Sequence, residues 1–252
     1  MKLTSKSRWV YSIKPSIHHI NTVLSRDEWV HRAAEILPSE KLDYLELGCA
    51  PGFYTAALAK EKPWTISGID YSDDANLFIE TISLIGKHAT LYREDLFGYQ
   101  IPAKFDIVAS FGLVEHFRGA SFETIMHLHN AYARADGYVV IAVPNFTGFP
   151  YIFHYLFDLP DLDNHNVDVM HPDTIASWLR DNGYSVLFSD YVGIMRLWGN
   201  SSFTDSRYLA KFVAGIAVGL SYVAQLLSFV GIKLVGRAWS PYLLIIARKH
   251  TA

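Results

Sequence analysis

Residues 43–54 read Asp-Tyr-Leu-Glu-Leu-Gly-Cys-Ala-Pro-Gly-Phe-Tyr and pass from an apolar run through a turn into a helical pattern. Residues 43–47 predict a buried strand, and Gly48 and Gly52 predict a tight turn directly after it. Residues 53–61 then favour a helix. Free N–H groups at a helix start, beside a glycine-bare backbone, let a nucleotide-like ligand approach closely. The segment therefore predicts a nucleotide site at the end of a strand.

Strands alternate with helices around this segment. Further strands are expected at residues 64–69, 89–92, 105–110, 138–143, 184–189 and 241–248, and helices at 27–36, 74–86, 121–135 and 172–182. This alternation predicts an α/β fold with a doubly wound, mostly parallel seven-stranded sheet. In such sheets a ligand binds beyond the carboxyl ends of the strands, where the strand order reverses.

Two of the expected helices carry a signal at their start. Ser25 and Glu28 form a Ser-x-x-Glu capping box, which predicts that the first helix begins at Asp27. His171 precedes Pro172, and because proline favours the first helical position, His171 is expected at a helix cap.

The whole chain, residues 1–252, is expected to form a single domain. Its predicted parts are an N-terminal arm and helix at 1–40, a core at 41–190 with an insertion at 145–171, an apolar helical insertion at 208–236, and the last strand at 240–249.

Composition narrows the class of protein. Half of the residues are hydrophobic and 19% are charged, which excludes a disordered chain. The only cysteine, Cys49, excludes a disulfide framework and suits a reducing cytoplasm. Residues 1–14 are basic and mixed, with no apolar signal core, so no export is predicted and the expected location is cytoplasmic.

The charges are unevenly distributed. The net charge is −3, yet residues 1–26 hold five basic residues and residues 206–252 hold six, and neither segment holds an acid. A nucleic-acid-binding domain would show a basic face across its body, so no nucleic acid is expected as a partner. Two basic ends could suit an anionic membrane surface, or they could be ordinary solvated charges.

The turn resembles a known motif. Glu46-x-Gly48-x-x-x-Gly52 resembles motif I of the class I S-adenosylmethionine-dependent methyltransferases. Asp70 ends the second strand, Asp95 follows the third, and residues 114–117 (Val-Glu-His-Phe) follow the fourth, which is where that family would place such residues. The resemblance covers about residues 40–190 and implies a Rossmann-like methyltransferase fold.

The resemblance implies how S-adenosylmethionine would be held. Asp70 would accept the ribose hydroxyl protons, Asp95 would receive the adenine amino group, and the backbone at the glycines would lie close to the ribose and methionine parts. The full set of implied cofactor contacts is Glu46, Gly48, Cys49, Gly52, Asp70, Tyr71, Asp95, Leu96, Ser110 and Phe111.

Other interpretations of these residues remain open. Asp70 and Asp95 could cap helices or form turns, and the glycines could form a structural turn in an NAD enzyme. The Gly-x-Gly-x-x-Gly spacing of dinucleotide sites is absent, which argues against a pyrophosphate ligand. Ala50 stands where many family members have glycine, and since alanine tolerates positive φ poorly, a local backbone change is expected.

The acceptor side points to hydroxyl chemistry. His116 lies just beyond the fourth strand, and the pKa class of histidine suits proton removal near neutral pH. The insertion at 145–171 is rich in aromatic residues and histidine, is similar to acceptor-pocket insertions of methyltransferases acting on glycans and lipid-linked substrates, and offers His165 as a second base. An O-methyltransferase is therefore favoured. N- or C-methylation of a small metabolite and a non-catalytic cofactor-binding protein remain alternatives.

A metal is not expected. Quinone-pathway O-methyltransferases hold a divalent metal with a glutamate three residues before a Glu-His pair. Glu115 and His116 match that pair, but Gly112 occupies the earlier position, so one carboxylate is missing.

Residues 212–232 carry no charge over 21 positions, which is long enough to span a bilayer. A single span would leave the last strand on the wrong side of the membrane. A helix lying on the membrane surface, or a buried or dimer-forming helix, is therefore expected within 208–236.

Overall fold

The computed structural model describes residues 14–157, 159–197 and 207–251. The first part of the predicted N-terminal arm, with three of its basic residues, lies outside the described residues.

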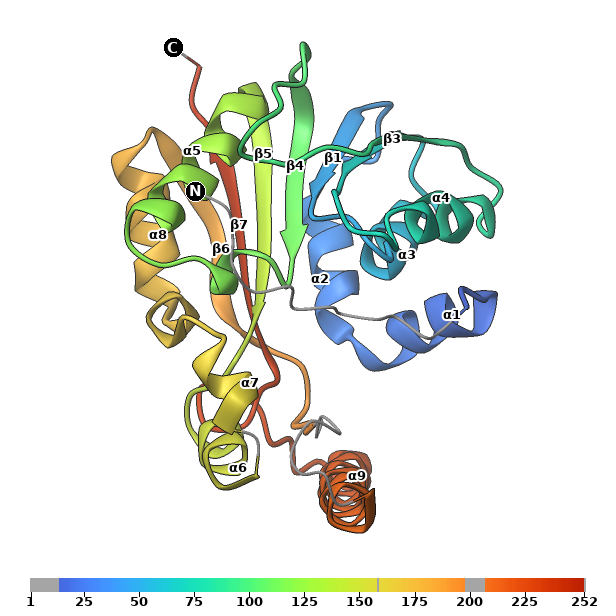
Figure 1. The fold of residues 1–252 in the computed structure, drawn as a ribbon, viewed down its shortest axis with the longest axis vertical. Coiled ribbons are helices and arrows are strands. Elements are labelled where there is room, and N and C mark those ends of the chain that lie inside the picture. Colours follow the sequence, from blue (N-terminus) through green and yellow to red (C-terminus); the bar gives the residue numbers. More distant parts are fainter. Residues whose placement is uncertain (1–13, 158, 198–206, 252) are drawn as a thin grey trace.

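One seven-stranded sheet forms the centre of the protein, in the order β3-β2-β1-β4-β5-β7-β6 (Figure 1). All neighbouring strands are parallel except β7, which runs antiparallel to both β5 and β6. The predicted mostly parallel sheet is thereby confirmed, and its order reverses between β1 and β4. The strands are β1 (Asp43–Leu47), β2 (Thr65–Ile69), β3 (Ala89–Tyr92), β4 (Phe105–Phe111), β5 (Ala133–Pro144), β6 (Tyr184–Val192) and β7 (Tyr242–Lys249).

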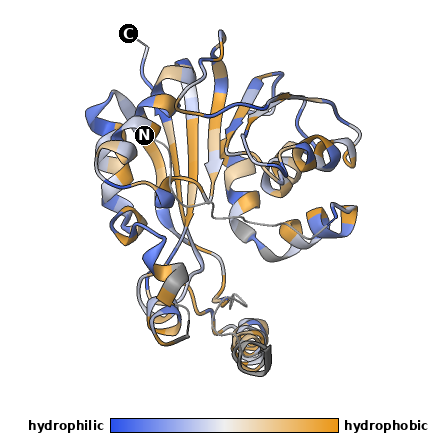
Figure 2. Cartoon of the chain, in the orientation of Figure 1, coloured by the Kyte–Doolittle hydropathy of each residue, from blue (hydrophilic) through white to orange (hydrophobic). Residues whose placement is uncertain are grey.

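Helices cover both faces of the sheet, because its central strands are apolar almost throughout (Figure 2). One face packs against residues of α1 (Ile17–Arg26), α2 (Glu28–Ile36), α3 (Phe53–Ala59) and α4 (Asn76–Ser83). The other packs against α5 (Ala120–Tyr132) and α8 (Pro172–Asp181). Two hydrophobic cores, one on each face, therefore hold the strand ends in place.

A third, smaller core lies below the carboxyl ends of the parallel strands in Figure 1. It joins α6 (Phe149–Phe157) to α9 (Arg207–Phe229) through residues that include Phe153, Ala217 and Ala224. Between β5 and α8 the chain also forms α7 (Leu159–Asp163) and the short 3-10 helix η2 (Val167–Met170), and η1 (Val114–His116) follows β4.

The predicted capping box is wrong. Ser25 lies inside α1, where its hydroxyl donates to the Thr22 carbonyl at 3.1 Å. Asp27 is the N-cap of α2 but caps no helix N–H with its side chain, which instead accepts a hydrogen bond from Arg196. The pattern failed because α1 extends to Arg26, directly before the N-cap of α2, and so includes Ser25. His171, by contrast, is the N-cap of α8 as expected.

Strand β5 begins at Ala133, inside the segment expected to be helical to residue 135. Arg134 donates to Asp106 at 2.7 Å and to Asp43 at 2.8 Å, so two neighbouring strands hold its guanidinium. These charge-assisted bonds fix the segment to the sheet rather than to α5.

Candidate functional site

The glycine turn lies at the point where the strand order reverses. Gly48 has φ +67° and donates its N–H to the Ile69 carbonyl of β2 at 2.9 Å. Gly52, with φ +84°, is the N-cap of α3. A Cβ on Gly48 would lie 2.8 Å from Leu113, and one on Gly52 would lie 2.5 Å from Phe78. Both positions therefore require glycine for conformation and for space.

Asp70 fixes the turn. Its Oδ2 accepts the Ala50 N–H at 3.0 Å, and its Oδ1 accepts the Ser72 N–H at 2.8 Å. Each carboxylate oxygen keeps a further lone pair, so a structural role in the turn leaves Asp70 able to accept hydroxyl protons from a ligand. Ala50 itself does not adopt positive φ, since Asp136 alone does so among the described non-glycine residues.

Glu46 and Cys49 face inward. Glu46 is 3% exposed and accepts a hydrogen bond from the Thr55 hydroxyl at 2.5 Å, and Thr55 also contacts the Tyr44 hydroxyl at 2.7 Å. Burial raises the pKa of Glu46 well above its ordinary value, and the charge of Asp70 adds to the rise. The Glu46 carboxyl group thus joins β1 to α3. Glu46 would therefore approach a ligand at the turn through its main-chain atoms.

The residues that the resemblance assigns to ribose and adenine lie at the ends of β2 and β3. Asp95 is exposed, and its Oδ1 accepts the Phe97 N–H at 3.0 Å. Leu96 is buried, whereas Tyr71 is 64% exposed. These positions share one edge of the sheet with Asp70 and the glycine turn. This arrangement is the one expected for residues that contact a single nucleoside.

Ser110 is turned away from this edge. Its hydroxyl is fully buried and lies 2.9 Å from Nε2 of His129 in α5. Phe111, next along β4, packs between Trp29 and Tyr54, with ring centroids 5.5 Å from each. Because the side chain of Ser110 points into the core, the implied contact of Ser110 with the cofactor would have to come from its backbone.

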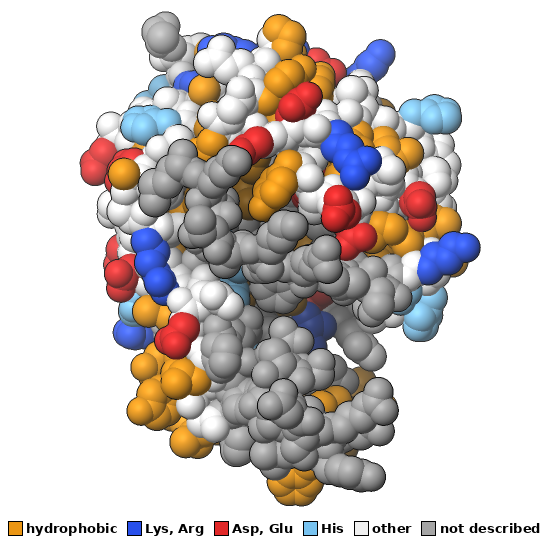
Figure 3. All heavy atoms as spheres, viewed as in Figure 1, with side chains coloured by type: hydrophobic (Ala, Val, Ile, Leu, Met, Phe, Trp, Pro, Cys, Tyr) orange, Lys and Arg blue, Asp and Glu red, His pale blue; other side chains and the backbone are white. Residues whose placement is uncertain are grey.

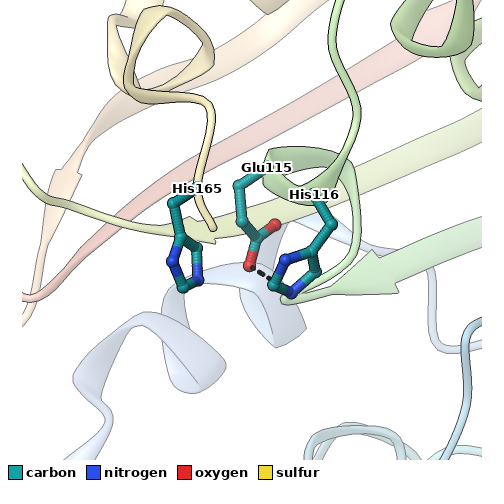
Figure 4. A group of neighbouring side chains, drawn as sticks. All are labelled: Glu115, His116 and His165. Carbon is teal, nitrogen blue, oxygen red and sulfur yellow. Dashed lines mark ion pairs between the residues drawn. The ribbon is translucent and has the colours of Figure 1, made fainter. Parts of the chain in front are cut away.

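Three side chains meet just beyond β4 (Figure 4). Glu115 and His116 come from η1, and His165 comes from the segment between α7 and η2. Nε2 of His116 lies 3.9 Å from Oε1 of Glu115, and the rings of His116 and His165 are 4.8 Å apart. Both histidines that were predicted as catalytic therefore lie in one cluster, 49 positions apart in the sequence.

Hydrogen bonds to backbone carbonyls hold His165 beside η1. The Asn166 N–H donates to the Glu115 carbonyl at 2.6 Å, and the Asn166 side chain donates to the Phe117 carbonyl at 2.9 Å. Arg118 donates to the carbonyls of Asp163 and His165 at 3.0 and 2.6 Å. The insertion is thus fastened to the strand end at several points, which fixes the geometry of the cluster.

The cluster favours neutral histidine. Burial, together with the neighbouring His165, lowers the pKa of His116 to about 4. His154 of α6 has its pKa lowered to about 4 for the same two reasons, and its ring lies 4.2 Å from that of Phe146. Phe146 also meets the His165 ring edge-on at 4.8 Å. Near neutral pH, His116 is therefore neutral, with one ring nitrogen that carries no proton.

The same three groups could also hold a cation. Glu115, His116 and His165 each offer a ligand atom, and these atoms lie within 4.8 Å of one another. The sequence argument against a metal depended on Gly112, but His165 supplies a third donor that the sequence spacing did not reveal. That the protein needs no metal stays a prediction.

Acid should destabilise the protein. Burial lowers the pKa of His116, His129 and His154 to about 4 from an ordinary value of 6.5. Between these pH values the unfolded chain binds more protons than the folded one, so the free energy of unfolding falls as pH decreases from 6.5 towards 4. Each histidine contributes up to about 3 kcal/mol to this loss. Urea denaturation at several pH values measures it.

His88, an exposed histidine, provides the control for this prediction. His88→Gln should leave the pH dependence unchanged, whereas replacing the buried pair with His129→Leu and Ser110→Ala should reduce it. A free energy of unfolding that stays constant from pH 7 to pH 5 would contradict the prediction.

One network near the site was not predicted. Arg196 donates to Asp27 and to the Tyr242 hydroxyl, and the Tyr54 hydroxyl donates to Tyr242 at 2.9 Å. Together with Trp29 these residues join α2, α3, β7 and the segment after β6. The paired residues Asp27 and Arg196 lie 169 positions apart, and no local pattern signals such a contact.

Comparison with known proteins identifies the family of this chain. A family model described as a methyltransferase domain matches residues 17–188. No curated protein matches the sequence closely enough to count as a relative.

Several solved structures share the fold. A SAM dependent methyltransferase from Archaeoglobus fulgidus is 20% identical with a TM-score of 0.58, over 91% of this chain and 94% of that one. A SAM-dependent methyltransferase from Geobacter sulfurreducens in complex with S-adenosyl-L-homocysteine is 14% identical with a TM-score of 0.55, over 96% and 95%. The N-methyltransferase NodS from Bradyrhizobium japonicum, also with S-adenosyl-L-homocysteine, is 12% identical with a TM-score of 0.52, over 98% and 93%.

Proposed function

The chain belongs to the methyltransferase-domain family and is an enzyme that uses S-adenosylmethionine, and from this premise we propose that it transfers the methyl group to a hydroxyl oxygen. The observation that carries the proposal is the cluster of Glu115, His116 and His165 beyond β4, in which Glu115 and His165 are buried and His116 is partly exposed. A hydroxyl acceptor must lose a proton, and this cluster offers a place for it.

The residues of the glycine turn would hold the cofactor. Asp70 and Asp95 would accept hydrogen bonds from its ribose and adenine, and the bare backbone of Gly48 and Gly52 would lie along it. When bound, S-adenosylmethionine supplies a methyl group activated by the sulfonium sulfur. The main work of the protein is then to orient the acceptor oxygen in line with that methyl group and to exclude water.

His116 is the proposed general base. During transfer to the acceptor oxygen, the neutral imidazole of His116 would take the hydroxyl proton of the acceptor. Glu115, whose Oε1 lies 3.9 Å from Nε2 of His116, would stabilise the imidazolium that forms. His165, fixed beside His116 by Arg118 and Asn166, is the second candidate for the base.

Transfer to nitrogen or carbon of a small metabolite is the alternative within the same class, and the fold does not decide between them, since NodS is an N-methyltransferase. A non-catalytic cofactor-binding protein is the alternative of another class. It would bind the cofactor but leave every acceptor unmethylated.

A matched pair of acceptors tests the proposal. The probes are 4-hexylphenol and 4-hexylaniline, which share a ring and an apolar tail and differ in the acceptor atom. With S-adenosylmethionine labelled in its methyl group, we expect label in the phenol ether, because the base cluster serves a hydroxyl. Label in the aniline alone would contradict O-methylation, and label in neither would favour the non-catalytic alternative.

The same assay tests the prediction that no metal is needed. After dialysis against EDTA, the rate of phenol methylation should be unchanged. A rate that falls with EDTA and returns with Mg²⁺, Mn²⁺ or Zn²⁺ would instead assign Glu115, His116 and His165 as metal ligands, whose atoms lie within 4.8 Å of one another.

A further inference from the structure

Helix α9 exposes a continuous apolar face. Its outward residues recur every three or four positions, and many are more than half exposed: Phe212 at 65%, Val218 at 58%, Tyr222 at 65%, Val223 at 52%, Leu226 at 59% and Phe229 at 85%. The chain after the helix continues this surface with Val230 at 73% and Ile232 at 53%. A contiguous exposed apolar patch on a protein surface normally marks an interaction site.

Helix α6 exposes a second apolar surface. Ile152, Tyr155 and Leu156 are 53%, 56% and 61% exposed, while Phe153 between them is buried in the small core that also contains Ala217 and Ala224 of α9. Figure 3 shows hydrophobic side chains gathered at the lower left, over α6. The inner sides of the two helices therefore border one small core, which also contains Met195 and Leu197, and their outer sides lie in solvent.

This apolar end adjoins the acceptor site. Both helices lie beyond the carboxyl ends of the parallel strands (Figure 1). His154, on the inner side of α6, has its ring 4.2 Å from Phe146, which in turn contacts His165. One short helix thus connects the exposed apolar surface to the cluster that is proposed to handle the acceptor proton.

The chain from α9 onward carries charges of one sign. From residue 206 to the end of the chain there are six basic residues and no acid, and Lys233 and Arg237 are exposed directly after the helix. A twofold contact between two copies of α9 would bring these like charges together. An anionic lipid surface, in contrast, would pair with them while its acyl region received the apolar side chains.

We propose that α6 and α9 form a docking surface for an anionic lipid bilayer, on which the protein lies without spanning it. Among the helices that the structure describes, none has the length and hydropathy needed to cross a membrane. The consequence for the acceptor rests on the proposed function. The hydroxyl substrate would carry a lipid tail or a lipid-linked group, and the cluster beyond β4 would receive it from the membrane side.

Vesicle flotation tests the docking surface directly. The probes are vesicles of phosphatidylcholine with 30% phosphatidylglycerol and vesicles of phosphatidylcholine alone. We expect the protein to float with the anionic vesicles and to be released by high salt. Lys233→Gln and Arg237→Gln should each weaken binding about fivefold, because one basic residue near the surface contributes about 1 kcal/mol.

Two double variants locate the surface. Tyr222→Glu with Leu226→Glu changes α9, and Ile152→Glu with Leu156→Glu changes α6. Each should reduce flotation at least tenfold. Leu187→Glu on β6, where Leu187 is 47% exposed, is the matched control and should float as the unchanged protein does. Calorimetric binding of S-adenosylhomocysteine, checked for every variant, shows that the fold is retained.

Three results would overturn the proposal. One is a protein that stays wholly in the soluble fraction with anionic vesicles, and another is double variants that float undiminished. The third is a concentration-dependent dimer that the α9 variant abolishes, since this would assign the face to a second copy. All three leave the methyl-transfer assay with 4-hexylphenol unaffected, so the docking surface and the proposed function can fail separately.

Discussion

Gly52→Ala is expected to weaken cofactor binding strongly. Gly52 has φ +84°, and an added Cβ would lie 2.5 Å from the side chain of Phe78, which is fully buried. The left-handed backbone costs roughly 1–2 kcal/mol for alanine, and overpacking adds about 1–3 kcal/mol. Since the strain falls on the turn that holds the cofactor, affinity for S-adenosylhomocysteine should fall about 100-fold in calorimetry.

Gly86→Ala is the matched control. Gly86 has φ +73°, but an added Cβ would have nothing within 4 Å. It should lose stability through the backbone alone, by roughly 1–2 kcal/mol in urea denaturation, and keep its cofactor affinity. Equal losses of affinity in the two variants would show that the turn at Gly52 does not shape the binding site.

His116→Ala is expected to reduce kcat by about 10²–10⁴-fold with 4-hexylphenol, which is the usual contribution of a positioned base. The affinity for S-adenosylhomocysteine should not change, because His116 lies beyond β4 and outside the turn. With burial lowering its pKa to about 4, the unchanged enzyme should keep its rate as pH falls to about 5. Stopped assays across pH 4–8 measure both effects.

His165→Ala separates the two candidate bases. If His116 is the base, His165→Ala should lower kcat less than His116→Ala does, since His165 then only packs beside it at 4.8 Å. The exposed residue His88, changed to Gln, should leave kcat unchanged. A His116→Ala enzyme with full activity would contradict the proposed role of His116, and a larger loss in His165→Ala would transfer the role to His165.

Much of the cofactor side could be predicted from the sequence, because its determinants are local. Strand β1, the glycine turn and helix α3 follow one another within residues 43–59, and the polarity of each segment specifies its structure. Asp70 could be placed because parallel strands bring their carboxyl ends to one edge of the sheet. The orientation of Ser110 could not be predicted, since its partner His129 lies on another helix.

The acceptor side depends on contacts between distant parts of the chain. His165 reaches His116 only because Arg118 and Asn166 fasten the insertion to η1, and nothing in the spacing of residues 145–171 indicates that. The capping box at Ser25 misled for a related reason. The pattern is local, but Ser25 lies inside α1, and the Asp27 side chain binds Arg196, which lies 169 positions later.

The account depends most on the cofactor, and one measurement tests it directly. Titration calorimetry of S-adenosylhomocysteine into the full chain should show one binding site per chain, with affinity lost in Gly52→Ala and in Asp70→Ala and kept in Gly86→Ala. If the unchanged protein binds neither S-adenosylhomocysteine nor S-adenosylmethionine, the assignment of the glycine turn and Asp70 to this cofactor is contradicted.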